Sequence, residues 1–90
     1  MKKRERLDVI KDILQAIKNN NGKIKPTRLL SSSNLSSLLF KEYIKELLES
    51  KLIDEIKDKK GKKYYVVLEK GDEFLVKYFA FNRFVNDLGL

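Results

Sequence analysis

Hydrophobic residues recur every three to four positions in three stretches of the chain, the spacing that places them on one face of an α-helix. The first stretch, RLDVIKDILQAIKNN at residues 6–20, carries such a face made of Leu7, Ile10, Ile13, Leu14 and Ile17. The NNNG sequence at residues 19–22 favours a helix end, because Asn and Gly adopt a left-handed backbone most readily. We therefore predict a first helix that ends in this sequence.

A short strand and a short second helix are predicted next. Residues 23–25 read KIK and are a candidate strand. Pro26 suits the first turn of a helix, where a missing N–H leaves no bond unmade. The segment PTRLLSSS is expected to stay short, because its serines compete with the helix for backbone hydrogen bonds.

A third helix follows the serine-rich turn. Ser36 is placed to cap its N-terminus. One broad apolar face carries Leu39, Phe40, Tyr43, Ile44, Leu47 and Leu48. The opposite face carries Ser37, Leu38, Lys41, Glu42 and Lys45. A short helix, a turn and a capped second helix together indicate a helix-turn-helix.

Two short β-runs, IDEIK at residues 53–57 and KYYVVL at residues 63–68, flank a glycine-containing turn and predict an antiparallel hairpin. A hairpin directly after a helix-turn-helix is a wing, and one long helix then closes the chain. The expected fold class is α+β, mainly α. We expect a winged helix-turn-helix domain at residues 1–68 and a C-terminal dimerisation helix at residues 69–90.

The charge is basic and unevenly distributed. Twenty Lys and Arg against thirteen Asp and Glu give a net charge of +7, and the pI is about 9.6. Residues 1–63 carry a net +8 and residues 64–90 a net −1. The basic residues 1–63 predict a surface that binds a polyanion, and the near-neutral residues 64–90 predict a different role for the end of the chain.

Several kinds of chemistry lack the residues they need. The chain has no cysteine and no histidine, which excludes disulfides, thiol nucleophiles and Cys/His metal sites. Its four glycines are isolated, so no phosphate-binding loop is indicated. Asp8, Asp12 and the serines of residues 31–37 are explained by a solvated helix face and by turn chemistry. We expect no enzyme activity, no cofactor, no metal and no small-molecule ligand.

No membrane span or signal-peptide core is indicated by the sequence either. We expect a cytoplasmic, nucleoid-associated protein.

The segment NLSSLLFKEYIKELLESKLI, followed at a fitting distance by EKGDEFL, resembles the small archaeal winged-helix DNA-binding proteins. The resemblance covers roughly residues 5–80. It implies that the last helix pairs with a second copy as an antiparallel coiled coil, and that the protein is a chromatin-associated protein or a transcriptional regulator. The family often has a threonine where Leu68 or Glu69 stands here, so no hydroxyl is expected to cap the last helix.

The hairpin turn KDKKGKK is the first candidate for a function. It crowds together Lys57, Lys59, Lys60, Lys62 and Lys63. Mutual repulsion means that this turn contributes nothing to stability by itself. It is either a solvated hairpin tip or a set of contacts to DNA phosphates, each of which releases counterions on binding. Its place after a helix-turn-helix favours phosphate contact.

The exposed face of the third helix is the second candidate. For contact with a DNA major groove we predict Ser36, Ser37, Leu38, Lys41 and Lys45. No Arg, Asn or Gln occupies this face to form bidentate hydrogen bonds with a base, so loose sequence specificity is expected. Phosphate contacts near the second helix are predicted for Lys25, Thr27 and Arg28. The basic tail with Lys2, Lys3, Arg4 and Arg6 either adds to them or is a mobile solubilising segment.

The last helix carries aromatic residues at heptad spacing. The predicted dimer interface consists of Phe74, Tyr78, Phe81, Val85 and Leu88. Leu75 and Phe79 form a second stripe, which is expected to pack on the winged domain. Left uncovered, such a seam would form an apolar patch of a kind that monomers avoid.

Two functions remain open from the sequence. The first is a homodimer that binds double-stranded DNA as a transcriptional regulator or chromatin-architectural protein. The alternative is a protein-interaction module that uses the aromatic last helix and does not bind DNA.

Overall fold

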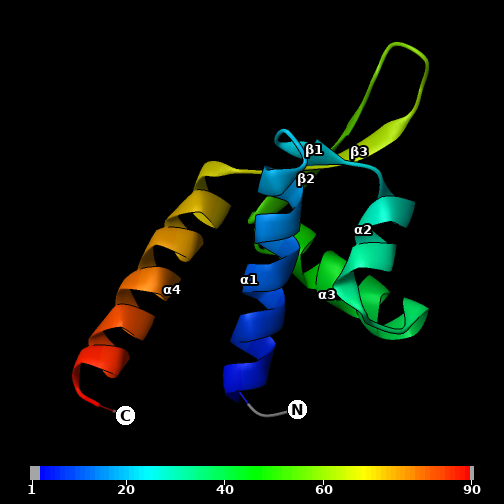
Figure 1. Ribbon diagram of the computed structural model, residues 1–90. Helices are drawn as coiled ribbons and strands as arrows, with labels where there is room; N and C mark the ends of the chain where they lie inside the picture. Colours follow the sequence, from blue (N-terminus) through cyan, green and yellow to red (C-terminus); the bar gives the residue numbers. More distant parts are fainter. Residues whose placement is uncertain (1–2, 90) are drawn as a thin grey trace.

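The computed structural model describes residues 3–89 and shows helices arranged below a small sheet (Figure 1). In chain order its elements are α1 (Lys3–Asn19), β1 (Lys23–Ile24), α2 (Pro26–Ser33), α3 (Ser37–Glu49), β2 (Ile53–Lys57), β3 (Lys63–Val67) and α4 (Glu69–Asp87). The predicted element order and the mainly helical winged-helix fold are confirmed. None of the helices within the described range is long and apolar enough to cross a membrane.

The helix ends follow the local signals in the sequence. The backbone after α1 is left-handed at Asn21, with φ of 62°, and at Gly22, with φ of 84°. In α2 the Ser33 hydroxyl donates to the Leu30 carbonyl at 2.8 Å, and Asn34 ends the helix in a left-handed conformation with φ of 59°. The predicted helix ends at NNNG and at the serines are therefore confirmed.

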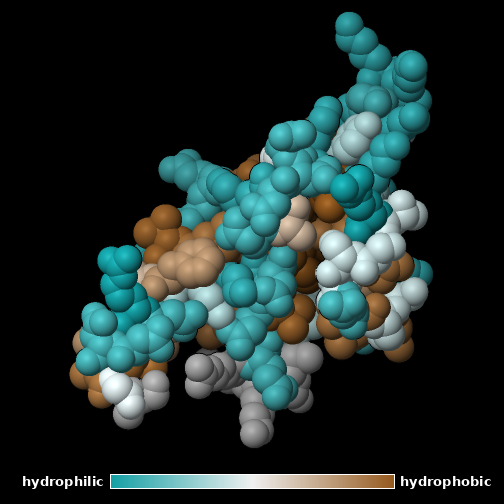
Figure 2. Space-filling view, in the orientation of Figure 1, coloured by the Kyte–Doolittle hydropathy of each residue, from teal (hydrophilic) through white to brown (hydrophobic). Residues whose placement is uncertain are grey.

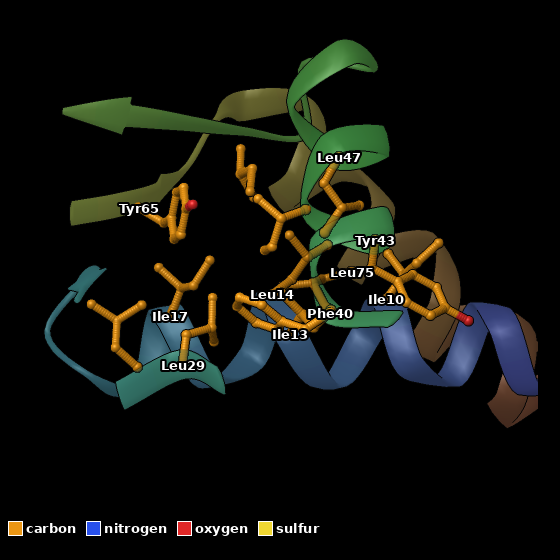
Figure 3. Close-up of a cluster of buried hydrophobic side chains, with 13 residues drawn as sticks. Ile10, Ile13, Leu14, Ile17, Leu29, Phe40, Tyr43, Leu47, Tyr65 and Leu75 are labelled. Carbon is orange, nitrogen blue, oxygen red and sulfur yellow. The ribbon is translucent and has the colours of Figure 1, made fainter. Parts of the chain in front are cut away.

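The sheet is antiparallel with strand order β1-β3-β2. Its inner face packs on the helices through Ile24, Ile53 and Tyr65, all of which are buried. The fully buried centre of the core consists of Ile13, Leu14, Ile17, Leu29, Leu47 and Ile53 (Figure 3 shows the cluster). This single core fixes the position of α3 and of the wing, which is the hairpin of β2 and β3.

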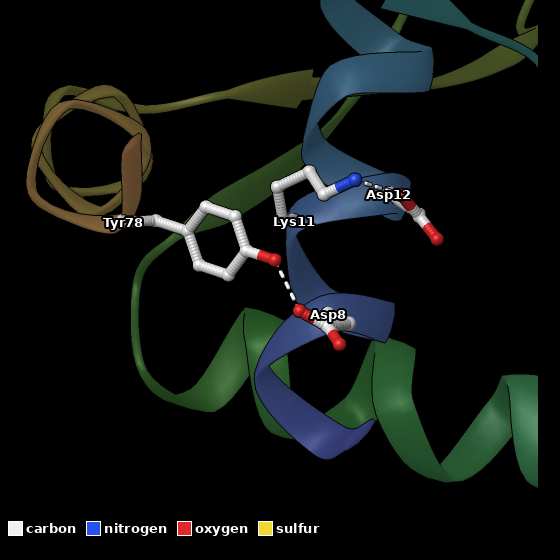
Figure 4. A network of polar contacts seen from close by, with 4 residues as sticks. All are labelled: Asp8, Lys11, Asp12 and Tyr78. Atoms are coloured by element: carbon white, nitrogen blue, oxygen red, sulfur yellow. Dashed lines mark hydrogen bonds and ion pairs between the residues drawn. The ribbon is translucent and has the colours of Figure 1, made fainter. Parts of the chain in front are cut away.

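Helix α4 lies antiparallel to α1, on the side of α1 away from α2 and α3 (Figure 1). Leu75 is buried in the core. Phe74 is half-buried and packs against the core cluster. Lys18 pairs with Asp72 at one end of the contact. At the other end the Tyr78 hydroxyl donates to Asp8 (Figure 4), and this hydrogen bond raises the pKa of Tyr78. The first half of α4 is thus attached to the winged domain.

The start of α4 is fixed by a close approach of two backbones. Leu68 occupies the N-cap without a side-chain hydrogen bond, as expected from the missing threonine. Its N–H donates to the Leu52 carbonyl at 3.0 Å. Gly71 lies over the same carbonyl, and a Cβ added to Gly71 would stand 2.3 Å from that oxygen and 2.7 Å from Val67 Cγ1. Only glycine fits at this position.

Substituting Gly71→Ala is therefore expected to destabilise the fold. Overpacking against a backbone carbonyl costs on the order of 1–3 kcal/mol beyond any gain in helix propensity. In a domain of this size that loss lowers the melting temperature by roughly 5–15 °C. Thermal unfolding followed by circular dichroism measures it, with Lys70→Ala at the neighbouring exposed position as the control. A Gly71→Ala protein as stable as the wild type would contradict the close approach.

Candidate nucleic-acid and self-association interfaces

Helix α3 is capped and oriented by its own sequence. The Ser36 side chain accepts a hydrogen bond from the Leu39 N–H at 3.2 Å, so the predicted cap is confirmed. The helix buries Phe40, Tyr43, Ile44 and Leu47 in the core. Burial of that face turns the opposite face to solvent.

The outward face of α3 carries the residues predicted for DNA contact. Exposed on it are Ser36, Ser37, Leu38, Lys41 and Lys45. Leu38 is 71% exposed. Lys41 and Lys45 form no ion pair with any residue that the structure describes. Glu42 is exposed on the same face, so the face carries two lysines against one carboxylate, with one apolar side chain near its N-terminal end.

The tip of the wing is shaped by Asp58. The Gly61 N–H donates to the Asp58 carbonyl at 3.0 Å, and Gly61 has φ of 81°, so the chain reverses in a tight turn followed by a left-handed glycine. Asp58 Oδ1 accepts from the N–H groups of Lys60 at 2.8 Å and Lys62 at 2.9 Å. The aspartate is thus the organising residue of the turn.

The wing projects away from the helices and its surface is hydrophilic (Figure 2). All five of its lysines are exposed, namely Lys57, Lys59, Lys60, Lys62 and Lys63. Lys63 Nζ lies 3.1 Å from Glu55 Oε1, and this bond raises the pKa of Lys63. The other four have no carboxylate partner among the described residues. Lys57 and Lys63 stand opposite each other in the hairpin, so their like charges repel.

A shallow groove joins α3 to the wing. Its volume is about 370 Å³, and it is lined by Phe40, Lys41, Ile44, Lys45, Leu48, Glu49 and Tyr65. The floor is apolar, and burial there raises the pKa of Tyr65. Lys41 and Lys45 stand on the α3 side of the groove. Tyr65 of β3 lines the groove from the wing, so the groove runs from α3 to the base of the wing.

The remaining basic positions behave differently from one another. Lys25, Thr27 and Arg28 are exposed at the start of α2, where Pro26 occupies the first turn. Arg6 is bound within the domain, because it pairs with Glu46 of α3 and lies 5.8 Å from the ring centre of Tyr43. Lys2 and the side chains of Lys3 and Arg4 lie outside the described residues. Arg6 is therefore held by contacts within the domain and is not a free side chain for a phosphate contact.

The predicted seam on α4 divides into two parts. Phe74 and Tyr78 contact the chain's own domain, as described above. Beyond them Phe81 is 64% exposed, Leu88 is 56% exposed and Val85 is half-buried. Phe84, which the heptad pattern did not include, is 58% exposed and lies between Phe81 and Leu88 at helical spacing. We call Phe81, Phe84, Val85 and Leu88 the α4 stripe.

Phe79 is a correction to the sequence interpretation. It was expected to pack on the winged domain beside Leu75, but it is 49% exposed, while Leu75 is buried. Val76, one turn earlier on the same side, is exposed as well. Only the helix face that carries Leu75 and Tyr78 is turned to the domain, and Val76 and Phe79 lie on another face of α4.

The short helix α2, the turn, the capped helix α3 and the antiparallel hairpin of β2 and β3 define a winged helix-turn-helix protein. The sequence profile of the winged helix-turn-helix family matches residues 3–86, and the chain belongs to this family. No curated protein sequence matches the chain.

Solved structures agree on the fold. Sso10a-2, a DNA-binding protein from Sulfolobus solfataricus, is similar with a TM-score of 0.70 and 20% sequence identity, over 91% of this chain and 82% of that one. F93 from STIV, a winged-helix DNA-binding protein, is similar with a TM-score of 0.69 and 22% identity, over 81% of this chain and 85% of that one. At these identities the likeness establishes the shared fold.

Proposed function

We propose that the protein is a homodimer that binds double-stranded DNA in the cytoplasm, in association with the nucleoid. The observation that carries the proposal is a set of exposed lysines without ion-pair partners among the described residues, on α3 and the wing: Lys41, Lys45, Lys57, Lys59, Lys60 and Lys62. Phosphates would neutralise these charges and relieve their repulsion. Both structural neighbours are described as DNA-binding proteins, which supports the same conclusion.

In this proposal α3 enters the major groove and the wing follows the phosphate backbone. Ser36, Ser37, Lys41 and Lys45 offer hydroxyl and ammonium contacts that many sequences can satisfy. Leu38 meets the methyl group of a thymine, which gives an exposed leucine an apolar partner. Lys25, Thr27 and Arg28 add phosphate contacts from the start of α2. The result is binding with loose sequence preference, as a transcriptional regulator of relaxed specificity or a chromatin-architectural protein requires.

The second half of α4 supplies the dimer contact in this proposal. The described part of the winged domain does not cover the α4 stripe, whose exposed phenylalanines are costly to leave in water. Pairing with the same stripe of a second copy would bury them in a coiled coil. Residues 69–90 would then act as the dimerisation helix, and two winged domains would address two segments of DNA.

Removing the α3 lysines tests the proposed docking. A variant with Lys41→Ala and Lys45→Ala is expected to bind a random-sequence duplex more weakly. The slope of log affinity against log salt concentration should flatten by about one unit for each lysine removed from each domain that binds. The same loss of charge at Lys18 and Lys77, which lie away from α3, is the control. Fluorescence anisotropy of a labelled duplex measures both. Equal weakening in the two variants would show that only net charge matters, and this would contradict docking through α3.

Glu55 is expected to restrain DNA binding. It holds Lys63 in an ion pair, so a phosphate has to compete with a carboxylate for this lysine. Glu55→Gln frees Lys63 and is expected to raise duplex affinity several-fold. The slope of log affinity against log salt concentration should become steeper by about one unit. Glu73→Gln breaks the similar Lys77–Glu73 pair on α4, at 2.7 Å, and is the control for charge. An increase no larger than that of the control would contradict a wing contact through Lys63.

A protein-interaction module without DNA binding is the alternative function. The observation in its favour is the exposure of Val76 and Phe79 on a side of α4 that the α4 stripe does not include. In that case the six free lysines would bind polyanions weakly and with a shallow salt dependence. A partner protein of a different sequence would then cover α4 in place of a second copy.

A further inference from the structure

The sheet has a second face that neither the core nor the proposed duplex interface uses. The strand register places on it Lys23, Asp54, Ile56, Tyr64 and Val66, opposite to the buried Ile24, Ile53 and Tyr65. We call these five residues the outer face. Ile56 is 41% exposed, and Tyr64 and Val66 are half-buried. An apolar surface with one aromatic ring therefore lies open at the base of the wing.

The ring of Tyr64 turns its flat side outward. The Lys23 ammonium lies 4.8 Å from the centre of this ring, the position of a cation above an aromatic face. Lys23 is exposed on β1, so the ring face below it is covered by one exposed side chain. A flat ligand that displaces the ammonium can stack on Tyr64 with Ile56 and Val66 beside it.

The charges around this ring are arranged for an anion. The strand register places Lys23 on this side, and Lys25 follows it with an extended backbone, φ −71° and ψ 145°. Lys62 directly precedes β3, two positions before Tyr64. None of the three is ion-paired with a described residue. The two nearby carboxylates bind backbone N–H groups instead: Asp54 Oδ1 accepts from Glu55 at 2.8 Å, and Asp58 binds the wing tip as described above.

We propose that the outer face binds single-stranded nucleic acid. An unpaired base stacks on Tyr64, while Lys23, Lys25 and Lys62 hold the phosphates on either side of it. Stacking requires an uncovered base face, and in a duplex both faces of each base are covered by neighbouring pairs, so a single strand fits this surface. Base stacking on an aromatic ring is stronger than the contact of an exposed lysine with it, so the base displaces Lys23 towards a phosphate. The site shares Lys25 and Lys62 with the proposed duplex interface, but its stacking surface at Tyr64 lies apart from α3 and its groove, so it goes beyond the proposed duplex binding.

The test compares single strands with a duplex in variants of Tyr64. The probes are labelled twelve-residue oligonucleotides of deoxythymidine and of uridine, and a random duplex. Tyr64→Val, which keeps a strand-forming residue but removes the ring, is expected to lower single-strand affinity by about 10-fold. Tyr64→Phe keeps the ring and should bind like the wild type. Duplex affinity should change by less than about twofold in both variants, since Tyr64 lies outside the duplex interface.

A second measurement uses the wild-type protein alone, so it does not depend on the folding of a variant. A twelve-residue strand of abasic sugar-phosphate units keeps the charges and removes the bases. It is expected to bind about 10-fold more weakly than the thymidine strand. Equal binding of the abasic and thymidine strands, or equal losses for duplex and single strand in Tyr64→Val, would overturn the proposal. Preference between the thymidine and uridine strands identifies whether DNA or RNA is the better ligand.

Discussion

A variant with Phe81→Glu and Phe84→Glu is expected to be a monomer under conditions in which the wild-type protein is a dimer. Both side chains are mostly exposed on the single chain, so the substitutions cost its fold little. In the proposed dimer the same positions meet a second copy, where four buried glutamates would repel one another without partners. Light scattering coupled to size-exclusion chromatography should report the 10.6 kDa chain mass for the variant and twice that mass for the wild type.

Loss of the dimer should also weaken DNA binding. Two winged domains held together bind more tightly than one, because the second contact is intramolecular, and the gain is about 10²-fold or more where both reach the duplex. Lys70→Glu changes the net charge by the same amount as the two phenylalanine substitutions, so it controls for electrostatic effects. A wild-type protein that is itself a monomer, or a Phe81/Phe84 variant that keeps the dimer mass, would rule out pairing through the α4 stripe.

Replacing Lys59, Lys60 and Lys62 with alanine is expected to remove most of the wing's contribution to duplex binding. These lysines stand at the projecting tip and have no ion-pair partner among the described residues. Each phosphate contact accounts for about 0.9 units in the slope of log affinity against log salt concentration, so the slope should flatten by about two to three units for each domain that binds. Anisotropy titrations over a salt series measure this change.

The control for the wing removes equal charge elsewhere. Alanine at Lys18, Lys70 and Lys77 leaves the tip intact and lowers the net charge by the same amount. Lys18 and Lys77 are ion-paired in the structure, so they are poor donors to a phosphate. If this control flattened the slope as much as the tip variant, the wing would have no special part in binding.

Local signals in the sequence were sufficient to predict the element order. Pro26 at the first turn of α2, the Ser36 cap and the left-handed residues after α1 each act within a few positions of themselves, so their effect can be read without knowing the tertiary structure. The apolar faces of α1 and α3 were correct for the same reason, with one exception: Leu7 was predicted on the buried face of α1 but is 38% exposed. Both helices bury one face in a single core, and their spacing encodes that face.

Contacts between distant segments were not predictable in the same way. The Lys63–Glu55 pair depends on the hairpin register, which places Glu55 opposite Tyr65 and beside Lys63. The role of Asp58 was not predicted, because its hydrogen bonds to the N–H groups of Lys60 and Lys62 depend on the path of the backbone through the turn.

The division of the α4 seam likewise depends on packing between helices. Phe74 and Tyr78 fit a heptad with Phe81, but the antiparallel contact with α1 takes them into the chain's own domain. Phe84 was missed because the heptad spacing explained its neighbours without it. The spacing from Phe81 to Phe84 and Val85 and then to Leu88 is the remaining signal, and it describes a helical stripe that starts where α4 leaves the domain.

Duplex binding by the wild-type protein across a salt series tests the central claim most directly. The measurement is the anisotropy of a labelled random-sequence duplex between about 50 and 300 mM salt, a range in which counterion release dominates. With six unpaired lysines on α3 and the wing of each domain, we predict a slope of log affinity against log salt of about −5 for each domain that binds. A slope between about −1 and zero would contradict DNA binding by these lysines and would favour a protein partner for α4.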